Sequence, residues 1–371
     1  MVRPVVELDR EGIDRLIAQL GDSGFTVIAP TLSDGTISHG PISSSQDLPV
    51  GWTEVQDAGT YRLTRREDDA LFGYAVGPHS WKRFLHPPEV VVWQGDGGMT
   101  PLDLAPPPRY AFFGVRPCEM AAISIQDKVF LDSGFSDDVY RSRRTDAFIV
   151  EVECYEPGGT CFCASMGTGP GAVEGADLVV SEILDDEHRF VVRAGSDAGE
   201  EVLAALGAAE AETDVIAAAE QVVADAAARM GRTLDTDGLR AALTAQAQSE
   251  RWDEIAARCL TCANCTMACP TCFCAGIDDS LSLDGAVATR TRRWDSCFGL
   301  EFSYIHGGSL RTSAASRYRQ WITHKLSTWW DQFGSSGCVG CGRCITWCPV
   351  GIDITAEATA MLAEARSEEA S

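Results

Sequence analysis

The sequence has no long apolar segment and few basic residues. No run of 18 or more apolar residues occurs in its 371 residues, and acidic side chains interrupt the alanine-rich stretch from 203 to 229, so no membrane-spanning helix is predicted. Lys and Arg number 30 against 54 Asp and Glu, for a formal net charge of −24. This charge repels nucleic-acid phosphates and anionic membrane surfaces. We therefore expect neither nucleic acid nor a membrane as a partner.

Common catalytic motifs are also missing. There is no G-x4-G-K-[ST] phosphate loop, no H-E-x-x-H and no evident Ser-His-Asp or paired-carboxylate arrangement, so nucleotide hydrolysis and the familiar hydrolase mechanisms are not predicted. The first 20 residues have apolar side chains at helical spacing and lack the apolar run of a secretion signal. We therefore expect a cytoplasmic protein.

Cysteine, in contrast, is abundant and unevenly distributed. Four of the 15 cysteines lie between 118 and 163, and the other eleven lie between 259 and 348. In a reducing cytoplasm, grouped cysteines more often bind metal or carry out redox chemistry than form structural disulfides. The grouping therefore predicts metal or redox centres.

The residue pattern along the chain changes twice. From about 25 to 195, short apolar or alternating runs such as YAFFGV and DLVVSEI are separated by Gly, Pro and Asp, which predicts strands. From 199 to about 258 the chain is alanine-rich with helical periodicity, and beyond it lies a cysteine-dense, largely helical region. We predict an α+β protein with a mixed α/β domain at 1–198, a helical connector at 199–250, and an α-helical ferredoxin-like dicluster domain with an acidic tail at 251–371.

The charge follows this division. Residues 1–250 carry a net charge of −22, whereas residues 251–348 carry +2. Basic residues between the two main cysteine motifs either offset the negative charge of thiolate-bound clusters or lie on solvated helix faces. These residues are Arg290, Arg292, Arg293, Arg311, Arg317, Arg319 and Lys325.

Two complete cysteine motifs carry the chemistry. Each reads C-x2-C-x2-C-x3-C-P, in which three thiolates wrap one face of a [4Fe-4S] cubane and the fourth reaches the other cluster. The ligation is therefore predicted to be crossed. Cluster 1 takes Cys259, Cys262, Cys265 and Cys348, and cluster 2 takes Cys338, Cys341, Cys344 and Cys269. A zinc site is the alternative, but it leaves the third cysteine and the proline of each motif unexplained.

The other seven cysteines form two sets. Cys118, Cys154, Cys161 and Cys163 match the number of ligands in one more cubane, so a third [4Fe-4S] cluster is one interpretation, and packing in the core is the other. The segment TCFCA occurs twice, at 160–164 and at 271–275. Cys272, Cys274 and Cys297 are most simply read as residues that pack near cluster 2.

The chain resembles a known family over most of its length. It is similar to the iron–sulfur beta subunit of cytoplasmic NAD(P)-linked [NiFe] hydrogenases of the sulfhydrogenase type, and to the related iron–sulfur subunit of anaerobic sulfite reductase. The phrases that carry the resemblance are GPHSWKRFLHPP (77–88), FFGVRPCEMAAI (112–123), GGTCFCASMGTGP (158–170), CLTCANCTMACPTCFC (259–274), RRWDSCF (292–298) and CVGCGRCITWCPVGID (338–353).

This resemblance implies a subunit that relays electrons and does not turn over a substrate alone. The implied partners are the large and small [NiFe] hydrogenase subunits and an iron–sulfur subunit that binds flavin and NAD(P). The cofactors would be two [4Fe-4S] clusters, or three if the upstream cysteines bind one. Two alternatives stay open: the corresponding subunit of an anaerobic sulfite reductase complex, and a self-contained sulfur-reducing enzyme with a site at Cys154, Cys161 and Cys163.

Overall fold

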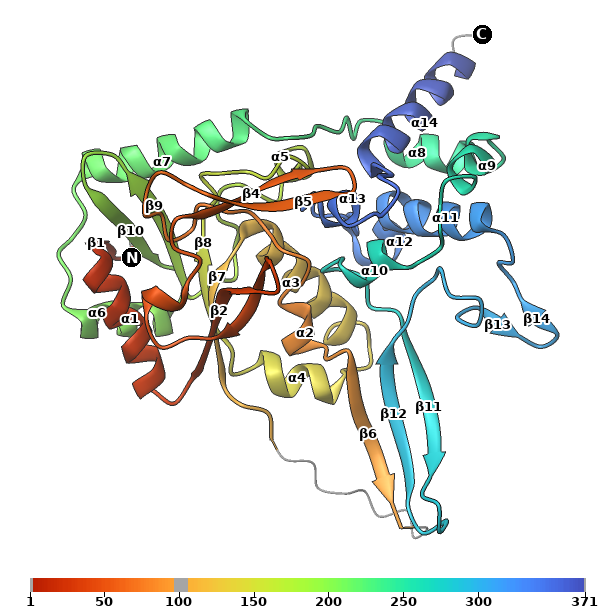
Figure 1. Cartoon of the computed structure of the whole chain (residues 1–371), viewed down its shortest axis with the longest axis horizontal. Helices are drawn as coiled ribbons and strands as arrows, with labels where there is room; N and C mark the ends of the chain where they lie inside the picture. The colour runs from red at the N-terminus through yellow and green to blue at the C-terminus, as the bar shows by residue number, and fades with distance from the viewer. Residues whose placement is uncertain (1–2, 97–105, 370–371) are drawn as a thin grey trace.

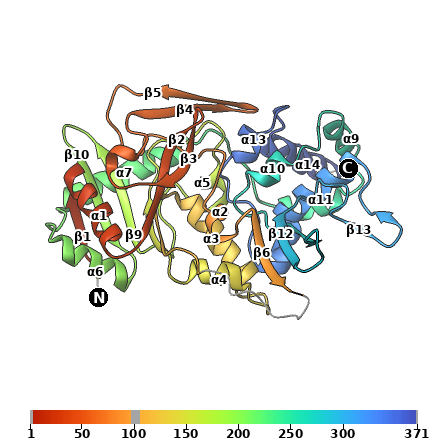
Figure 2. The same ribbon diagram turned by 60° about the horizontal axis from the view of Figure 1, so that its bottom comes forward.

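A computed structural model describes residues 3–96 and 106–369, so the outer limits of the predicted domains, at 1 and 371, lie outside the described residues. Figures 1 and 2 show a sheet-containing part, which includes the N-terminus, beside a mainly helical part that holds the second half of the chain. Within the described residues, no helix is long and apolar enough to cross a membrane.

The first part is built on a seven-stranded sheet in the order β1-β10-β9-β8-β7-β2-β3. The four central strands, β9, β8, β7 and β2, run parallel to one another. At the edges, β3 pairs antiparallel with β2, and β10 and β1 pair antiparallel on the other side. The strands are β1 (Val5–Leu8), β2 (Thr26–Ser33), β3 (Thr36–Pro41), β7 (Tyr110–Val115), β8 (Phe148–Val152), β9 (Leu178–Leu184) and β10 (His188–Ala194). The strands predicted from the apolar runs in this region are confirmed.

Helices cover both faces of this sheet, which explains why β7, β8 and β9 are almost wholly buried and read as continuous apolar runs. One face packs on α1 (Arg10–Asp22) and α6 (Asp197–Leu206), and the other on α3 (Pro117–Phe130) and α7 (Thr213–Ala228). Helix α1 follows the predicted spacing: Ile13, Leu16, Ile17 and Leu20 are all buried. Short helices α2 (Lys82–Leu85), α4 (Asp138–Arg144), α5 (Cys163–Met166) and η1 (Ser45–Asp47) lie in the connections.

The alanine-rich segment has two environments. Its helices α6 and α7 contact the sheet, whereas α8 (Leu239–Ala245) contacts the last helix, α14 (Ile354–Glu369). The division at 199–250 stays a prediction. The cysteine-rich part also contains α9 (Arg251–Ala256), α10 (Asn264–Met267), α11 (Ala314–Thr323), η2 (His324–Thr328), α12 (Trp329–Phe333) and α13 (Arg343–Thr346).

A three-stranded arm projects from the molecule beside the cysteine-rich part (Figure 1). It consists of β11 (Ala275–Leu281), β12 (Ala288–Trp294) and β6 (Glu89–Gly95), paired in that order. The strand-rich pattern of residues 25–195 predicted β6. The hairpin of β11 and β12, in contrast, lies in a region that the sequence predicted to be largely helical. The alternating Thr and Arg side chains of β12 favour an extended strand. A second, smaller hairpin is formed by β13 (Tyr304–Ile305) and β14 (Gly308–Ser309).

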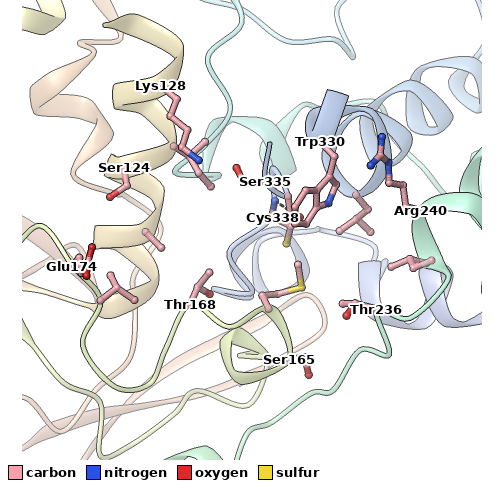
Figure 3. Close-up of a pocket in the computed structure, with 17 residues that line it drawn as sticks. Ser124, Lys128, Ser165, Thr168, Glu174, Thr236, Arg240, Trp330, Ser335 and Cys338 are labelled. Atoms are coloured by element: carbon pink, nitrogen blue, oxygen red, sulfur yellow. Dashed lines mark hydrogen bonds between the residues drawn. The ribbon is translucent and has the colours of Figure 1, made fainter. Parts of the chain in front are cut away.

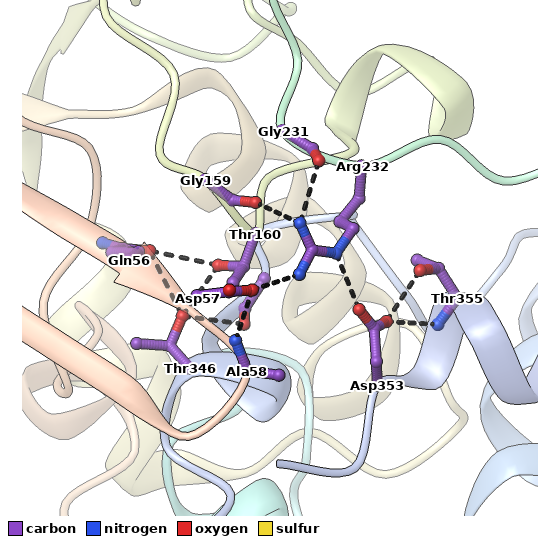
Figure 4. A network of polar contacts seen from close by, with 11 residues as sticks. Gln56, Asp57, Ala58, Gly159, Thr160, Gly231, Arg232, Thr346, Asp353 and Thr355 are labelled. Atoms are coloured by element: carbon purple, nitrogen blue, oxygen red, sulfur yellow. Dashed lines mark hydrogen bonds and ion pairs between the residues drawn. The ribbon is translucent and has the colours of Figure 1, made fainter.

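A polar network fastens the two parts together (Figure 4). Arg232 donates to the carboxylate of Asp353 at 2.7 Å, to the carbonyl of Gly159 at 2.8 Å, and to Asp57. Asp57 ends β4 (Trp52–Asp57), which forms a hairpin with β5 (Thr60–Arg65). Beside this network, the hydroxyls of Thr160 and Thr346 lie 2.7 Å apart. The loop at 159–160 is therefore held directly against the second cysteine motif.

Candidate iron–sulfur centres

The first group of cysteines surrounds a small hollow next to α10. Thr261 and Ala263 have positive φ angles of 51° and 66°, and this left-handed backbone lets the short segment curl. The hollow is lined by Cys259, Cys262, Cys265 and Cys348, together with Phe298, Tyr318 and Trp321, and Cys344, predicted for cluster 2, also borders it. The structure thus brings together the four residues predicted for cluster 1, with the fourth contributed by the other motif.

The second group lies deeper. Cys338, Cys341 and Cys269 are buried, and Cys344 is partly exposed. The thiol of Cys344 is close enough to those of Cys338, Cys341 and Cys269 for their charges to raise its pKa further, after the larger effect of burial. The structure brings together all four residues predicted for cluster 2. The assignment of these cysteines as ligands stays a prediction.

The backbone around the cysteines fits iron–sulfur clusters. Backbone N–H groups donate to cysteine sulfurs, as cluster ligands require: Thr261 to Cys259 at 3.4 Å, Gly340 to Cys338 at 3.5 Å and Ile352 to Cys348 at 3.3 Å.

Burial raises the pKa of several of these thiols, whereas a hydrogen bond from Cys272 and the charge of Lys325 hold the pKa of Cys269 well below its usual value. Burial raises the pKa of Cys338 to about 12 and the pKa of Cys265 well above its usual value. Without iron, such thiols remain protonated near neutral pH. Cluster insertion must therefore release protons, because only the thiolate is a ligand.

Lys325 is a buried cation at cluster 2. Its side chain is buried, and its Nζ lies 3.3 Å from Cys269 Sγ, 2.8 Å from the Thr271 hydroxyl and 3.1 Å from the Gly337 carbonyl. Burial alone would lower the pKa of Lys325, but the cysteines around it raise that pKa well above its usual value. The ammonium group thus remains charged and offsets thiolate charge. This is the first of the two roles that the sequence suggested for the basic residues.

The four upstream cysteines also meet. Cys118 lies in the first turn of α3, directly after β7, and Cys154 follows β8. Because β7 and β8 are parallel neighbours, their carboxyl ends meet at one edge of the sheet, which is where sites form in such sheets. The loop with Cys161 and Cys163 closes over this edge. After burial, the larger cause, the charges of Cys163, Cys341 and Cys154 further raise the pKa of the Cys118 thiol.

This upstream group is packed against the second cysteine motif. The Phe162 N–H donates to the Gly340 carbonyl at 2.8 Å. A Cβ on Gly340 would lie 2.6 Å from the Cys163 backbone, and one on Gly342 would lie 2.4 Å from the Thr160 hydroxyl. Glycine is therefore required here by contact with the loop as well as by positive φ angles of 64° and 75°.

Sequence reasoning missed two buried arginines at this junction. Arg116, two residues before Cys118, donates to the carbonyls of Glu153 at 3.1 Å and Phe72 at 2.7 Å. Arg343, inside the second motif, forms an ion pair with Glu119. Their positions beside cysteines in R-P-C-E and C-G-R-C were an available signal.

A cavity of about 620 Å³ opens beside this junction (Figure 3). Helix α3 forms one side with Ser124 and Lys128, and the helical part forms the other with Arg240 and Trp330. Cys338 lies among its lining residues. Of the second group, Cys338 lines this cavity, whereas Cys341 is buried.

These centres define an iron–sulfur protein with a dicluster domain. Residues 258–352 match the family described as the 4Fe-4S dicluster domain, so the chain carries two [4Fe-4S] clusters. The chain is also 34% identical over 352 residues to sulfhydrogenase 2 subunit beta of Pyrococcus furiosus. The aligned residues cover 94% of this chain and 95% of that protein. The chain belongs to the family of sulfhydrogenase beta subunits.

Proposed function

We propose that this chain is the cytoplasmic electron-relaying subunit of a multisubunit [NiFe] hydrogenase. One observation carries the proposal: Cys341 lies near Cys338 and Cys269 of cluster 2 and also near the upstream cysteines Cys118, Cys161 and Cys163. Three cysteine groups thus follow one another through the molecule. This order supports a path from cluster 1 through cluster 2 to a third [4Fe-4S] cluster.

Crossed ligation keeps clusters 1 and 2 close together. Cys265 lies in the four-residue helix α10 and Cys269 follows that helix, yet the two serve different clusters in this proposal, as do Cys344 and Cys348. Cluster 1 is the more accessible, since Cys262 is exposed and the other three cysteines are partly exposed. Electrons would therefore enter or leave the subunit at cluster 1 and pass between it and the more deeply buried cluster 2.

The partners we propose are the large and small [NiFe] subunits and an iron–sulfur subunit that binds flavin and NAD(P). The relative's name, a sulfhydrogenase subunit beta, supports a multisubunit complex. Large apolar side chains exposed on the two hairpins and near them support contact with other chains, because isolated subunits rarely expose so many together. These residues are Ile277, Leu281, Leu283, Leu300, Tyr304, Ile305 and Leu310.

The alternative of a self-contained sulfur-reducing site is less well supported. Cys161 and Cys163 are buried, and their loop is bonded to the backbone of the second motif. A substrate would have to displace this contact to reach them. A relay needs no such access, because electrons tunnel through packed protein.

The test uses the whole complex, purified without oxygen. In Cys161→Ser we expect the loss of about four iron atoms per chain, together with slower hydrogen-dependent reduction of NAD(P). A dye that accepts electrons directly at the [NiFe] partner should still be reduced at the normal rate, which controls for intact assembly. Unchanged iron content would remove the third cluster from the proposal, and unchanged NAD(P) reduction in Cys341→Ser would contradict the relay itself.

A further inference from the structure

Two of the three cysteines outside these centres form a pair at the base of the arm. Cys274 directly precedes β11, and Cys297 lies three residues after the end of β12. The Asp295 N–H donates to the Cys274 carbonyl at 2.9 Å, so the pairing of the two strands continues to the base of the hairpin. The thiol of Cys297 donates a hydrogen bond to the sulfur of Cys274. The hairpin therefore holds two thiols in direct contact, as the formation of a disulfide requires.

The third cysteine, Cys272, is associated with cluster 2 and not with this pair. Its thiol donates a hydrogen bond to the sulfur of Cys269, a predicted ligand of that cluster. Cys272 and both members of the pair line one cavity. The pair therefore lies next to cluster 2 without belonging to the predicted ligands of either cluster.

This cavity gives access to the pair. Cys274 and Cys297 are each partly exposed, and the cavity that they line has a volume of about 470 Å³. Phe273 and Phe302 form part of its wall. A space of this size with aromatic walls is typical of sites for organic molecules, and it is much larger than a single ion needs.

The cavity also carries positive charge. Arg311 and Lys325 line it, and their hydrogen bonds go to hydroxyl, amide and carbonyl oxygens and to one cysteine sulfur, with no carboxylate of the described residues among them. Trp321 and Trp329, which also line the cavity, are buried, and neither indole N–H has a hydrogen-bond partner within the described residues. Unpaired donors and unpaired positive charge favour a ligand with carboxylate groups.

We propose that Cys274 and Cys297 are a redox-active dithiol that reduces a negatively charged organic disulfide bound in this cavity. The Cys274 thiolate attacks one sulfur of the ligand, and the other sulfur leaves as a thiolate and takes up a proton. Cys297 then loses its proton and attacks the Cys274 sulfur, which releases the second ligand thiol and closes the Cys274–Cys297 disulfide. The pair is oxidised by two electrons, and the ligand is reduced to two thiols.

The hydrogen bond within the pair assigns these two roles. Cys274 accepts this bond, which, with help from the charge of Lys325, lowers the pKa of Cys274 to about 7. A thiol whose pKa is near the ambient pH is the most effective attacking thiol. Cys297, the donor of the bond, is placed to attack the Cys274 sulfur in the second step.

Returning the pair to the dithiol takes two electrons and two protons. The electrons come from the relay proposed above, on which this return step rests, and the protons enter from solvent through the cavity. The exchange step itself does not depend on the relay, so the two can be tested separately. A disulfide that only braces the hairpin is the alternative, but it leaves the cavity, its cations and its unpaired indoles without a role.

The first experiment tests the exchange step in the whole complex without oxygen. The complex is reduced with dithiothreitol, freed of it, and mixed with oxidised glutathione, which carries carboxylates. Two glutathione thiols should be released per chain, and peptide mapping should find Cys274 joined to Cys297. Cys274→Ser should lose this release, whereas Cys297→Ser should keep glutathione bound to Cys274. Cystamine, a disulfide without carboxylates, should react more slowly.

Ser280→Ala is the matched control for the serine variants. Ser280 lies in β11, is exposed and does not line the cavity, so this variant should react like the wild type. The second experiment adds hydrogen, with which the wild-type complex should reduce oxidised glutathione repeatedly. A first stoichiometric release without further turnover would support the pair and contradict the relay as its source of electrons.

Two results would overturn the inference. One is a dithiothreitol-reduced wild type that releases no glutathione, even where it still reduces NAD(P) with hydrogen. The other is equal release by the wild type and Cys274→Ser. If the serine variants do not fold, peptide mapping of the wild type decides, because a Cys274–Cys297 disulfide that resists dithiothreitol would be a structural bridge.

Discussion

Arg343 and Glu119 form a buried ion pair that joins the second cysteine motif to helix α3. Their side chains are 1% and 4% exposed. Arg343 also donates to the carbonyls of Gly77 and His79, each at 2.9 Å, and Glu119 accepts from the Trp81 indole at 3.0 Å. The pair lies next to Cys118 and Cys344 in the sequence. It therefore fixes the upstream cysteines relative to cluster 2.

Glu119→Gln should destabilise the junction. The substitution leaves the Arg343 guanidinium buried without a counter-charge, which costs about 3–5 kcal/mol. We expect a lower thermal unfolding temperature for the oxygen-free protein. Asp279→Asn is the control, because Asp279 pairs with Arg290 on the exposed arm, where ion pairs contribute little. Equal effects of both substitutions would contradict a structural role for the buried pair.

Gly340→Ala should disturb the upstream cysteines specifically. Its new Cβ would meet the Cys163 backbone at 2.6 Å, so the loop must move away. Gly334→Ala separates this clash from backbone strain, since Gly334 has a similar φ of 68° with nothing near its Cβ position; its cost should be only about 1–2 kcal/mol. Circular dichroism melts and iron content compare the two variants. Similar behaviour would mean that only the φ angle matters.

Lys325→Met should lower the reduction potential of cluster 2. The ammonium group that contacts Cys269 Sγ stabilises the more negative, reduced state, so its removal favours oxidation, with an expected shift on the order of tens of millivolts. Redox titration followed by EPR measures this shift. Lys128→Met is the control, because the exposed Lys128 amine donates to the carbonyl of Phe333 rather than to a thiol. A larger shift in the control would refute the assignment.

Glu151→Gln should reduce the pH dependence of stability. Burial, helped by Glu153, raises the pKa of Glu151 to about 8, and its side chain is fully buried. Since the folded pKa is raised, the protonated carboxyl's contribution is complete below its ordinary pKa near 4.5 and is lost as the pH rises through about 8. Between pH 5.5 and pH 8.5 the wild type should therefore lose more free energy of unfolding than the variant, by on the order of a few kcal/mol. The measurement is the fall in unfolding temperature between these two pH values. Parallel pH profiles would contradict the shifted pKa.

The sequence predicted the parts of the site that depend on local spacing. Eight cysteines in two short motifs of identical spacing can be grouped without knowledge of the fold, because the crossed pattern follows from the motif. The strands of the sheet were predictable for a similar reason, since apolar runs such as that of β7 are buried on both faces.

What could not be predicted depends on long-range packing. Cys118 and Cys154 meet only because β7 and β8 are parallel neighbours, which spacing does not reveal. Glycine is needed at 340 and 342 because residues 160–163 pack against them, a contact that the spacing of the motif does not reveal. Of the seven basic residues considered, Lys325 contacts a cysteine thiol, but Arg290 pairs with Asp279 on the arm and Arg317 bonds to the Phe298 carbonyl.

The contact between Phe162 and Gly340 has a consequence for the order in which the protein is built. Once the Phe162 N–H is bonded to the Gly340 carbonyl, the loop covers Cys341, which is only 8% exposed. Iron and sulfide must therefore reach this cysteine before the two parts close, so cofactor delivery precedes the last step of folding. A chain that closes empty would have to reopen before it could mature.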